Sequence, residues 1–199
     1  MMNTILKKYI DSLDINLIPE NRKLILGELK KYVEDKRNAG EQIALIFICT
    51  HNSRRSQLGQ IWAQTIGIYF GFSLNTYSGG VEVTAFNETA VETLKNSGFE
   101  ILKAGNSNPV YELKFASDKK SITAFSKVYD DAVNPKKDFA AVMTCSHADE
   151  NCPIIFGADT RISINYEDPK KADNTPSEKA VYEERCKQIA TEMKYVFNC

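Results

Sequence analysis

The stretch that decides the fold is Ile43-Ala-Leu-Ile-Phe-Ile-Cys49 followed by Thr50-His-Asn-Ser-Arg-Arg-Ser56. Its first part, Ile43 to Ile48, is a continuous apolar run, which is typical of a strand covered on both faces of a parallel sheet. Its second part is polar and leads into residues 56–70, where apolar side chains recur at helical spacing. With a short strand predicted at 74–78, the segment predicts a βαβ unit.

The same alternation of helices and strands continues toward the C-terminus. A helix is predicted for residues 87–97, with Gly98 as its stop, and a short apolar stretch at 99–102 extends the pattern. Further buried strands are predicted at 139–144 and 161–166. This order predicts an α/β fold with a doubly wound parallel sheet, in which ligands bind at the carboxyl ends of the strands.

Two segments add detail to this sheet. Residues 110–116 and 121–128 partly alternate around the turn-like segment 117–120, which predicts an inserted β-hairpin. The last helix is predicted to start at 175–178, where a capping box is combined with proline at the first helical position. Its apolar stripe consists of Tyr182, Cys186, Ile189, Met193 and Val196.

The first forty residues read as two short amphipathic helices that end at a break at residues 38–40. We therefore expect an N-terminal helical extension at 1–40 and a catalytic domain at 41–199. The extension could cover the sheet edge, close over the site or pair two subunits, and the sequence does not choose among these roles.

Composition limits the partners and the compartment that can be expected for this chain. The net charge of -1, from 25 basic and 26 acidic residues, gives no bulk field for nucleic acid or a membrane surface, so neither is expected as a partner. The first residues have neither the pattern of a signal peptide nor that of a spanning helix, which predicts a cytoplasmic protein. Five cysteines, an odd number, suit free or transiently paired thiols in a reducing compartment.

The loop after the first strand carries the chemistry. Its free backbone N–H groups and the positive end of the following helix dipole form a cradle for an anion. The same field favours the nucleophilic thiolate of Cys49. Arg55, six positions later, can grip two oxygens of a tetrahedral anion with its planar fork. The alternative is that Cys49 is an ordinary buried cysteine at a strand end.

The stretch FICTHNSRRSQ resembles the phosphate loop shared by low-molecular-weight protein tyrosine phosphatases and thioredoxin-coupled arsenate reductases. The resemblance implies that Cys49 is the nucleophile and that Arg55 binds the oxyanion. It also implies that Asn52 and Ser56 shape the loop and tune the thiolate. The sequence departs from the family at two positions: His51 replaces a glycine, and Arg54 replaces a second cysteine. The residues expected to hold a phosphate, sulfate or arsenate ion are Thr50, His51, Asn52, Ser53, Arg54, Arg55 and Ser56.

Two further motifs complete the resemblance. Asp168-Pro169 is similar to the pair that supplies the general acid in both families. The stretch TCSHADENCPI, with Cys145 and Cys152, resembles the redox pair of the arsenate reductases, in which two thiols supply the two electrons that arsenate reduction needs. A zinc site is disfavoured by the spacing, and unrelated buried thiols are the other alternative. We expect Cys186 in the core and Cys199 outside turnover.

The resemblance therefore implies reduction of arsenate through a Cys49 arseno-thiol and a relay to Cys145 and Cys152, with thioredoxin or a similar thiol as reductant. One alternative is a phosphotyrosine phosphatase that uses only Cys49, Arg55 and Asp168, and another is a non-catalytic oxyanion or redox sensor. No cofactor is required. Ser78 matches a position related to potassium binding in some arsenate reductases, but Gln60 replaces the glutamate often found there, so potassium is left open.

Overall fold

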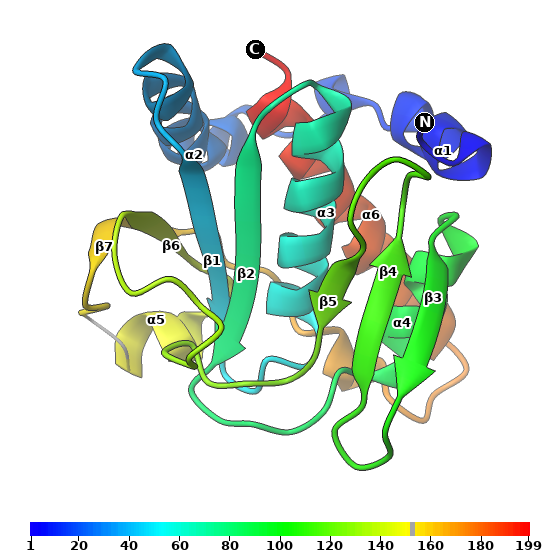
Figure 1. Cartoon of the computed structure of the whole chain (residues 1–199). Coiled ribbons are helices and arrows are strands. Elements are labelled where there is room, and N and C mark those ends of the chain that lie inside the picture. The colour runs from blue at the N-terminus through cyan, green and yellow to red at the C-terminus, as the bar shows by residue number, and fades with distance from the viewer. Residues whose placement is uncertain (152–153) are drawn as a thin grey trace.

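The computed structural model describes residues 1–151 and 154–199 (Figure 1). At its centre lies a four-stranded parallel sheet with the strand order β2-β1-β6-β7. This arrangement, with helices against the sheet, confirms the predicted α/β fold with a doubly wound sheet. The strands are β1 (Ile43–Cys49), β2 (Leu74–Gly80), β6 (Phe139–Met143) and β7 (Ala158–Ser163).

Burial on both faces explains why β1 is apolar without alternation. Leu45 and Phe47 point into the larger hydrophobic cluster, which includes side chains of α3 (Arg55–Tyr69) and α6 (Glu178–Phe197). Ile46 and Ile48 point into a second cluster on the opposite face, which includes Ala148 of α5 (Ser146–Asn151). Because each side chain in turn meets apolar neighbours, every position of the strand selects an apolar residue.

A second sheet is antiparallel and lies beside the first (Figure 1). Its order is β3-β4-β5, with β3 at Glu100–Ala104, β4 at Val110–Lys114 and β5 at Ile122–Ala124. The predicted hairpin is confirmed as β4 and β5. The expectation that the stretch at 99–102 extends the central alternation was wrong, because β3 pairs with β4. The short turn that joins them favours antiparallel pairing, whereas a parallel return needs a long crossover.

The N-terminal helices pack into the same core as the central sheet. They are α1 (Thr4–Ser12), the short 3₁₀ helix η1 (Ile15–Leu17) and α2 (Glu20–Asn38), so the two predicted helices are confirmed, although α2 is long. Their buried side chains join the larger cluster together with α6. The division at residue 40 stays a prediction. In the described ranges, no helix combines the length and the apolar character needed to span a bilayer.

Two predicted boundaries were wrong. Strand β7 spans Ala158–Ser163 and not 161–166, because it lies at an edge of the sheet and the polar residues 159–161 break the apolar pattern. The capping box does not form. Helix α6 begins at Glu178, whose carboxylate accepts from the backbone N–H of Asn174 (2.8 Å), while the Thr175 hydroxyl donates to the carbonyl of Ala172 (2.7 Å). A short 3₁₀ helix, η2 (Pro169–Ala172), precedes this turn, and the carbonyl of its last residue takes the hydrogen bond of the Thr175 hydroxyl.

Helix α4 (Glu88–Asn96) forms as predicted, with Asn87 as its N-cap.

Candidate active site

The predicted site residues come together at the carboxyl edge of the central sheet. Cys49 is the last residue of β1, and Cys145 lies just beyond the end of the neighbouring parallel strand β6. Asp168 lies beyond the end of β7, the next strand. Since parallel strands end at the same edge (Figure 1), all three side chains reach one side of the fold.

Cys49 is 3% exposed, and its sulfur is held by a short chain of hydrogen bonds. The Asn52 side-chain amide donates to Ser56 Oγ at 2.8 Å, and Ser56 Oγ lies 3.0 Å from Cys49 Sγ. Because the serine oxygen already accepts from Asn52, its own hydrogen is available to the sulfur. Such a donor stabilises a thiolate more than a thiol. Within the described ranges, the backbone N–H groups of residues 51–54 have no acceptor in the protein, so they are available to an anion.

Asn52 gives the loop its shape. Its φ of 46° lies in the left-handed region, which asparagine tolerates better than most residues. Its Oδ1 accepts from the backbone N–H of Lys127 at 3.0 Å and from Gln57 Nε2 at 3.1 Å. His51 does not adopt a positive φ, and its Nε2 lies 3.4 Å from Glu82 Oε2. The loop therefore accepts a side chain at position 51 without the freedom of glycine.

Gly80, the last residue of β2, passes so close to the loop that any side chain would collide with backbone. A Cβ there would lie 2.7 Å from the nitrogen of Asn52 and 2.9 Å from the oxygen of Thr50.

We expect Gly80→Ala to lower the free energy of unfolding by about 3 kcal/mol and to weaken phosphate binding, because the backbone must move. Gly27→Ala in α2 is the control, since no atom lies within 4 Å of its Cβ, and it is expected to stabilise by up to about 1 kcal/mol. Urea unfolding measures both, and equal stability of Gly80→Ala and wild type would contradict the close approach.

Arg55 lies beside the predicted acid. Its guanidinium donates from NH2 to Asp168 Oδ2 at 2.7 Å and from NH1 to the carbonyl of Tyr166 at 3.1 Å. The other oxygen of Asp168 accepts from the backbone N–H of Lys170 at 3.1 Å. Arg55 is only 9% exposed, and its buried Nε has no partner within the residues that the structure places. Arg55 and Asp168 are thus held at one place, as the sequence motifs predicted, and their roles as clamp and acid stay predictions.

Arg54 does not point into water. Its Nε donates to the Tyr182 hydroxyl at 2.6 Å, and its NH2 lies 3.0 Å from Asp173 Oδ2. The Tyr182 hydroxyl donates to the other oxygen of Asp173 at 2.7 Å, and burial raises the pKa of this phenol. The three side chains tie the loop to α6 and to the segment after η2. The sequence predicted only a core position for Tyr182 and no role for Asp173, because their contact depends on the tertiary fold.

The second predicted thiol lies against the loop. Cys145 is 2% exposed, and its Sγ lies 3.4 Å from the hydroxyl of Thr50, the residue after Cys49. The backbone N–H of Ala148 also approaches Cys145 Sγ at 3.4 Å, and His147 Nδ1 lies 3.3 Å from the Thr50 hydroxyl. Cys49 and Cys145 belong to the same buried cluster. Cys152 lies outside the described residues.

Asp149 connects α5, the helix that follows Cys145, to the last strand of the sheet. Asp149 accepts from the Ser163 hydroxyl at 2.7 Å and forms an ion pair with Arg161. Arg161 also donates to the Asp149 carbonyl. Ser163 and Arg161 both belong to β7, so Asp149 fixes the helix to the neighbouring strand.

The remaining cysteines lie away from the loop. Cys186 is fully buried and accepts from the indole of Trp62 at 3.2 Å, and burial raises the pKa of its thiol to about 12. It therefore takes the core position that the sequence predicted. Cys199 is exposed at the chain end. Among residues 1–151 and 154–199, no three His, Cys, Asp or Glu side chains are grouped to hold a metal ion.

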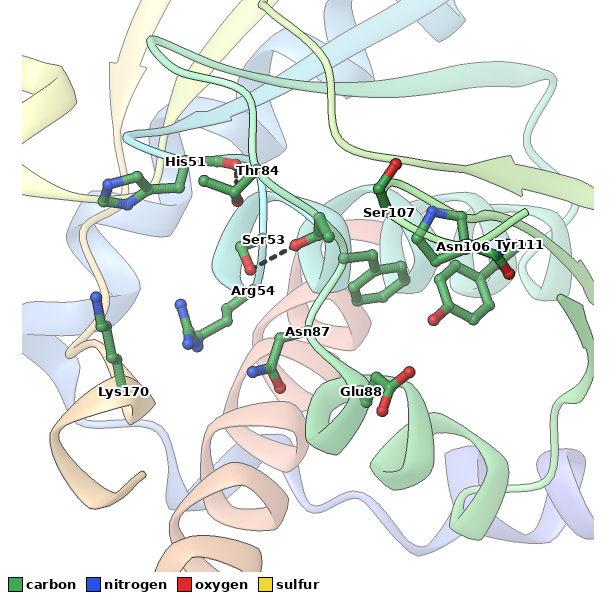
Figure 2. Close-up of a pocket in the computed structure, with 13 residues that line it drawn as sticks. His51, Ser53, Arg54, Thr84, Asn87, Glu88, Asn106, Ser107, Tyr111 and Lys170 are labelled. Carbon is green, nitrogen blue, oxygen red and sulfur yellow. Dashed lines mark hydrogen bonds between the residues drawn. The ribbon is translucent and has the colours of Figure 1, made fainter. Parts of the chain in front are cut away.

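A pocket of about 520 Å³ opens on the flank of the loop (Figure 2). Figure 2 shows Arg54 and Lys170 on one side and Ser107 and Tyr111 on the other. The Ser53 hydroxyl donates to the carbonyl of Ala85, another residue that lines the pocket, at 2.7 Å. The sequence did not predict this pocket, because one wall comes from the turn of the second sheet.

The residues related to potassium binding fit such an ion poorly. The Ser78 hydroxyl donates to Gln57 Oε1 at 3.3 Å, and Gln60 brings a neutral amide where a carboxylate would be needed. The ammonium of Lys127 lines the same pocket as Gln60 and would repel a second cation. Potassium stays a prediction, and no step below uses it.

Comparisons with known proteins agree with the geometry. No family profile matches the chain. The arsenate reductase of Halalkalibacterium halodurans is 30% identical over 135 residues, which cover 68% of this chain and 80% of that protein. The arsenate reductase of Bacillus subtilis is 27% identical over 155 residues, which cover 77% of this chain and 94% of that protein.

Solved structures show the same fold. A low-molecular-weight protein tyrosine phosphatase from T. tengcongensis has a TM-score of 0.54 at 18% identity, and the match covers 78% of this chain and 98% of that one. The solution structure of such a phosphatase from Bacillus subtilis has a TM-score of 0.53 at 14% identity, with coverage of 78% and 95%. These likenesses establish the architecture around the loop.

Proposed function

Because the chain belongs to the arsenate reductase family, within the superfamily of low-molecular-weight protein tyrosine phosphatases, we propose that it reduces arsenate to arsenite with its own thiols. The observation that carries this proposal is the position of Cys145, with its sulfur 3.4 Å from the hydroxyl of Thr50. A phosphatase needs one thiol at the loop, whereas a reductase needs a second one within reach.

In the first step, arsenate binds to the loop amides and to Arg55. The Cys49 thiolate attacks the arsenic atom and forms a sulfur–arsenic bond, and one arsenate oxygen leaves as water. Asp168 supplies the proton for this leaving oxygen, since its carboxyl group lies beside Arg55 at 2.7 Å. No electrons have been exchanged with the thiols at this stage, because arsenic becomes reduced only when the new bond breaks.

In the second step, the Cys145 thiolate attacks Cys49 Sγ. A Cys49–Cys145 disulfide forms, the electron pair of the sulfur–arsenic bond stays on arsenic, and arsenite is released. Cys152 then attacks Cys145 and frees Cys49, which leaves a Cys145–Cys152 disulfide. Thioredoxin or a similar thiol in the cytoplasm reduces that disulfide and closes the cycle.

The contacts of α5 are compatible with this relay. The seven-position separation of Cys145 and Cys152 does not by itself bring two sulfurs to bonding distance of about 2 Å, so the segment must rearrange. Asp149 is the main side chain that fastens it to β7. The relay therefore requires that the contacts of Asp149 break and that Ala148 leaves the buried cluster.

A second candidate function is hydrolysis of phosphomonoesters. It needs only Cys49, Arg55 and Asp168, and the 2.7 Å contact of Arg55 with Asp168 favours it as much as it favours reduction. In this reaction, Cys49 takes the phosphoryl group and water later releases phosphate, so no second thiol takes part.

Cys145→Ser separates the two functions. We expect this variant to lose multiple turnover in a thioredoxin-coupled arsenate assay while it still binds phosphate, because the loop amides and Arg55 are unchanged. Cys152→Ser should release one arsenite per chain and then stop. Cys199→Ser is the matched control, since that thiol is exposed at the chain end, and it should keep wild-type turnover.

Two other outcomes would contradict the relay or the reductase function. If Cys145→Ser and Cys152→Ser keep arsenate turnover, the relay is wrong. If wild type lacks arsenate turnover but hydrolyses p-nitrophenyl phosphate, and Cys145→Ser hydrolyses it equally fast, the phosphatase function replaces the reductase function.

A further inference from the structure

A second pocket, of about 590 Å³, lies between the two sheets and away from Cys49. Strand β2 is at one edge of the parallel sheet and β5 at one edge of the antiparallel sheet, and the pocket is lined by both, with α3 behind them (Figure 1). The side chains that form its floor and walls are Gln60, Tyr77, Ile122, Phe125, Lys127 and Val133.

The charged side chains among the described residues that line this pocket are all basic. Lys119, Lys120 and Lys127 line it, and none of the described residues that line it is acidic. Lys119 and Lys120 lie in the exposed turn before β5, at the entrance. Lys127 is only 4% exposed and belongs to the interior. A pocket with three ammonium groups and no carboxylate attracts anions.

The side chain of Lys127 lies in the interior, and no ion pair with it is formed in the described part of the chain. Its Nζ lies 4.6 Å from the centre of the Phe125 ring, and within residues 1–151 and 154–199 it has no hydrogen bond and no ion pair. Burial lowers the pKa of its ammonium to about 8, against a weaker opposing effect of Asp131. A buried ammonium is costly unless it is paired, so this residue is poorly explained by the stability of the fold alone.

Gln60 adds an unused acceptor to the same pocket. It is 4% exposed, and its Nε2 donates to the carbonyl of Thr123 at 3.2 Å, which fixes the orientation of the amide. Its Oε1 is buried without a hydrogen-bond partner in the described part of the chain. Buried polar atoms are nearly always paired, so this amide, like Lys127, is a polar group beside the pocket that the fold leaves incompletely satisfied.

We propose that this pocket binds a small organic anion that pairs its carboxylate or phosphate group with Lys127 and packs its apolar part against Phe125, Ile122 and Val133. Lys119 and Lys120 attract the anion at the entrance. This binding site is separate from the oxyanion loop and does not depend on the reaction proposed above.

The pocket nevertheless touches the segment that supports the loop. The backbone N–H of Lys127 donates to Asn52 Oδ1 at 3.0 Å, and the carbonyl of Phe125 accepts from Gln57 Nε2 at 2.8 Å. A ligand on Lys127 therefore contacts residues whose backbone holds Asn52 and the start of α3. Binding in the pocket is expected to change the turnover rate at Cys49, in addition to being measurable by itself.

The test is a titration by calorimetry with two probes: 4-hydroxybenzoate, which carries a carboxylate, and phenylphosphonate, which carries a phosphonate. We expect Lys127→Met to weaken binding of the preferred probe by at least about tenfold, because a desolvated charge pair is lost. Lys114→Met, an exposed lysine of β4 outside the pocket, is the control and should change the dissociation constant less than about twofold. The preferred probe identifies the anionic group.

Arg55→Lys distinguishes the pocket from the loop. If the probe occupies the loop, binding is lost in Arg55→Lys and kept in Lys127→Met, and the proposal is overturned. It is also overturned if Lys127→Met binds both probes as tightly as wild type does.

A measurement on the unchanged chain covers the case in which Lys127→Met does not fold. Wild type is treated briefly with acetic anhydride, and acetylation of each lysine is followed by peptide mass spectrometry. We expect the preferred probe to slow acetylation of Lys127 by at least about fivefold and to leave Lys114 unaffected, because a bound anion covers the amine and holds its proton. Equal rates with and without both probes would rule out the site.

Discussion

Replacing Cys49 with serine is expected to abolish turnover, with a loss of at least about 10⁴-fold, while binding of phosphate persists. The buried sulfur lies 3.0 Å from Ser56 Oγ, and its attack on the oxyanion starts both candidate reactions. A serine hydroxyl in the same place remains protonated at neutral pH and cannot form a disulfide. The loop amides and Arg55 are unchanged, so the anion site survives. A thioredoxin-coupled assay measures arsenate turnover, and p-nitrophenyl phosphate hydrolysis measures phosphatase turnover. Titration with phosphate measures binding of the anion.

Two controls make this prediction specific. Cys199→Ser removes an exposed thiol and should behave as wild type. Cys186→Ser removes a core thiol that accepts from Trp62, so it is expected to lower stability but not the activity of the folded fraction. Activity above about one thousandth of wild type in Cys49→Ser would show that another group is the nucleophile.

The second large effect is expected for Arg55→Lys, which keeps the charge but removes the fork. We expect kcat/KM to fall by about 10² to 10³-fold, the cost of losing one well-placed donor to a developing oxyanion. The guanidinium of Arg55 contacts Asp168 through one nitrogen and the carbonyl of Tyr166 through another, and a single ammonium cannot keep both contacts and also bind two anion oxygens. Steady-state kinetics and phosphate titration provide the measurement.

The neighbouring arginine is the matched control. Arg54→Lys loses the bidentate contact with Tyr182 and Asp173, so it should lower the free energy of unfolding by about 1 to 3 kcal/mol. Its effect on kcat/KM at a temperature where the protein stays folded should be less than about tenfold. If Arg54→Lys impairs kinetics as strongly as Arg55→Lys does, the clamp is shared and the assignment to Arg55 alone is wrong.

The sequence predicted the centre of the fold well because the signals there are local. The apolar run of β1 and the polar loop that follows it are adjacent in the chain, and burial on both faces leaves a pattern that can be read directly. Motif spacing also placed Arg55 near Asp168, since both follow strands of the same sheet. The order β2-β1-β6-β7 was not predicted, because strand order depends on contacts between distant segments.

What the sequence missed is tertiary in origin. The strand β3 could not be assigned to its sheet, since its partner is chosen by the turn that follows it. The anchors of Arg54 are 119 and 128 positions away along the chain. The burial of Lys127 was not predicted. A lysine in an alternating segment is expected to be solvated, whereas packing against Phe125 buries this one. The role of Cys152 stays a prediction.

The attachment of α5 to β7 through Asp149 has a consequence for the timing of the cycle. With Asp149 bound to Ser163 and Arg161, Cys145 is 2% exposed and its sulfur lies against the Thr50 hydroxyl, so the thiol is shielded from external reductants. In the proposed relay, release of this latch would expose the oxidised thiol pair, so that an external reductant is used only after arsenite has left. Amide hydrogen exchange over residues 145–151 would follow the latch directly, protected in the resting enzyme and fast in the oxidised one.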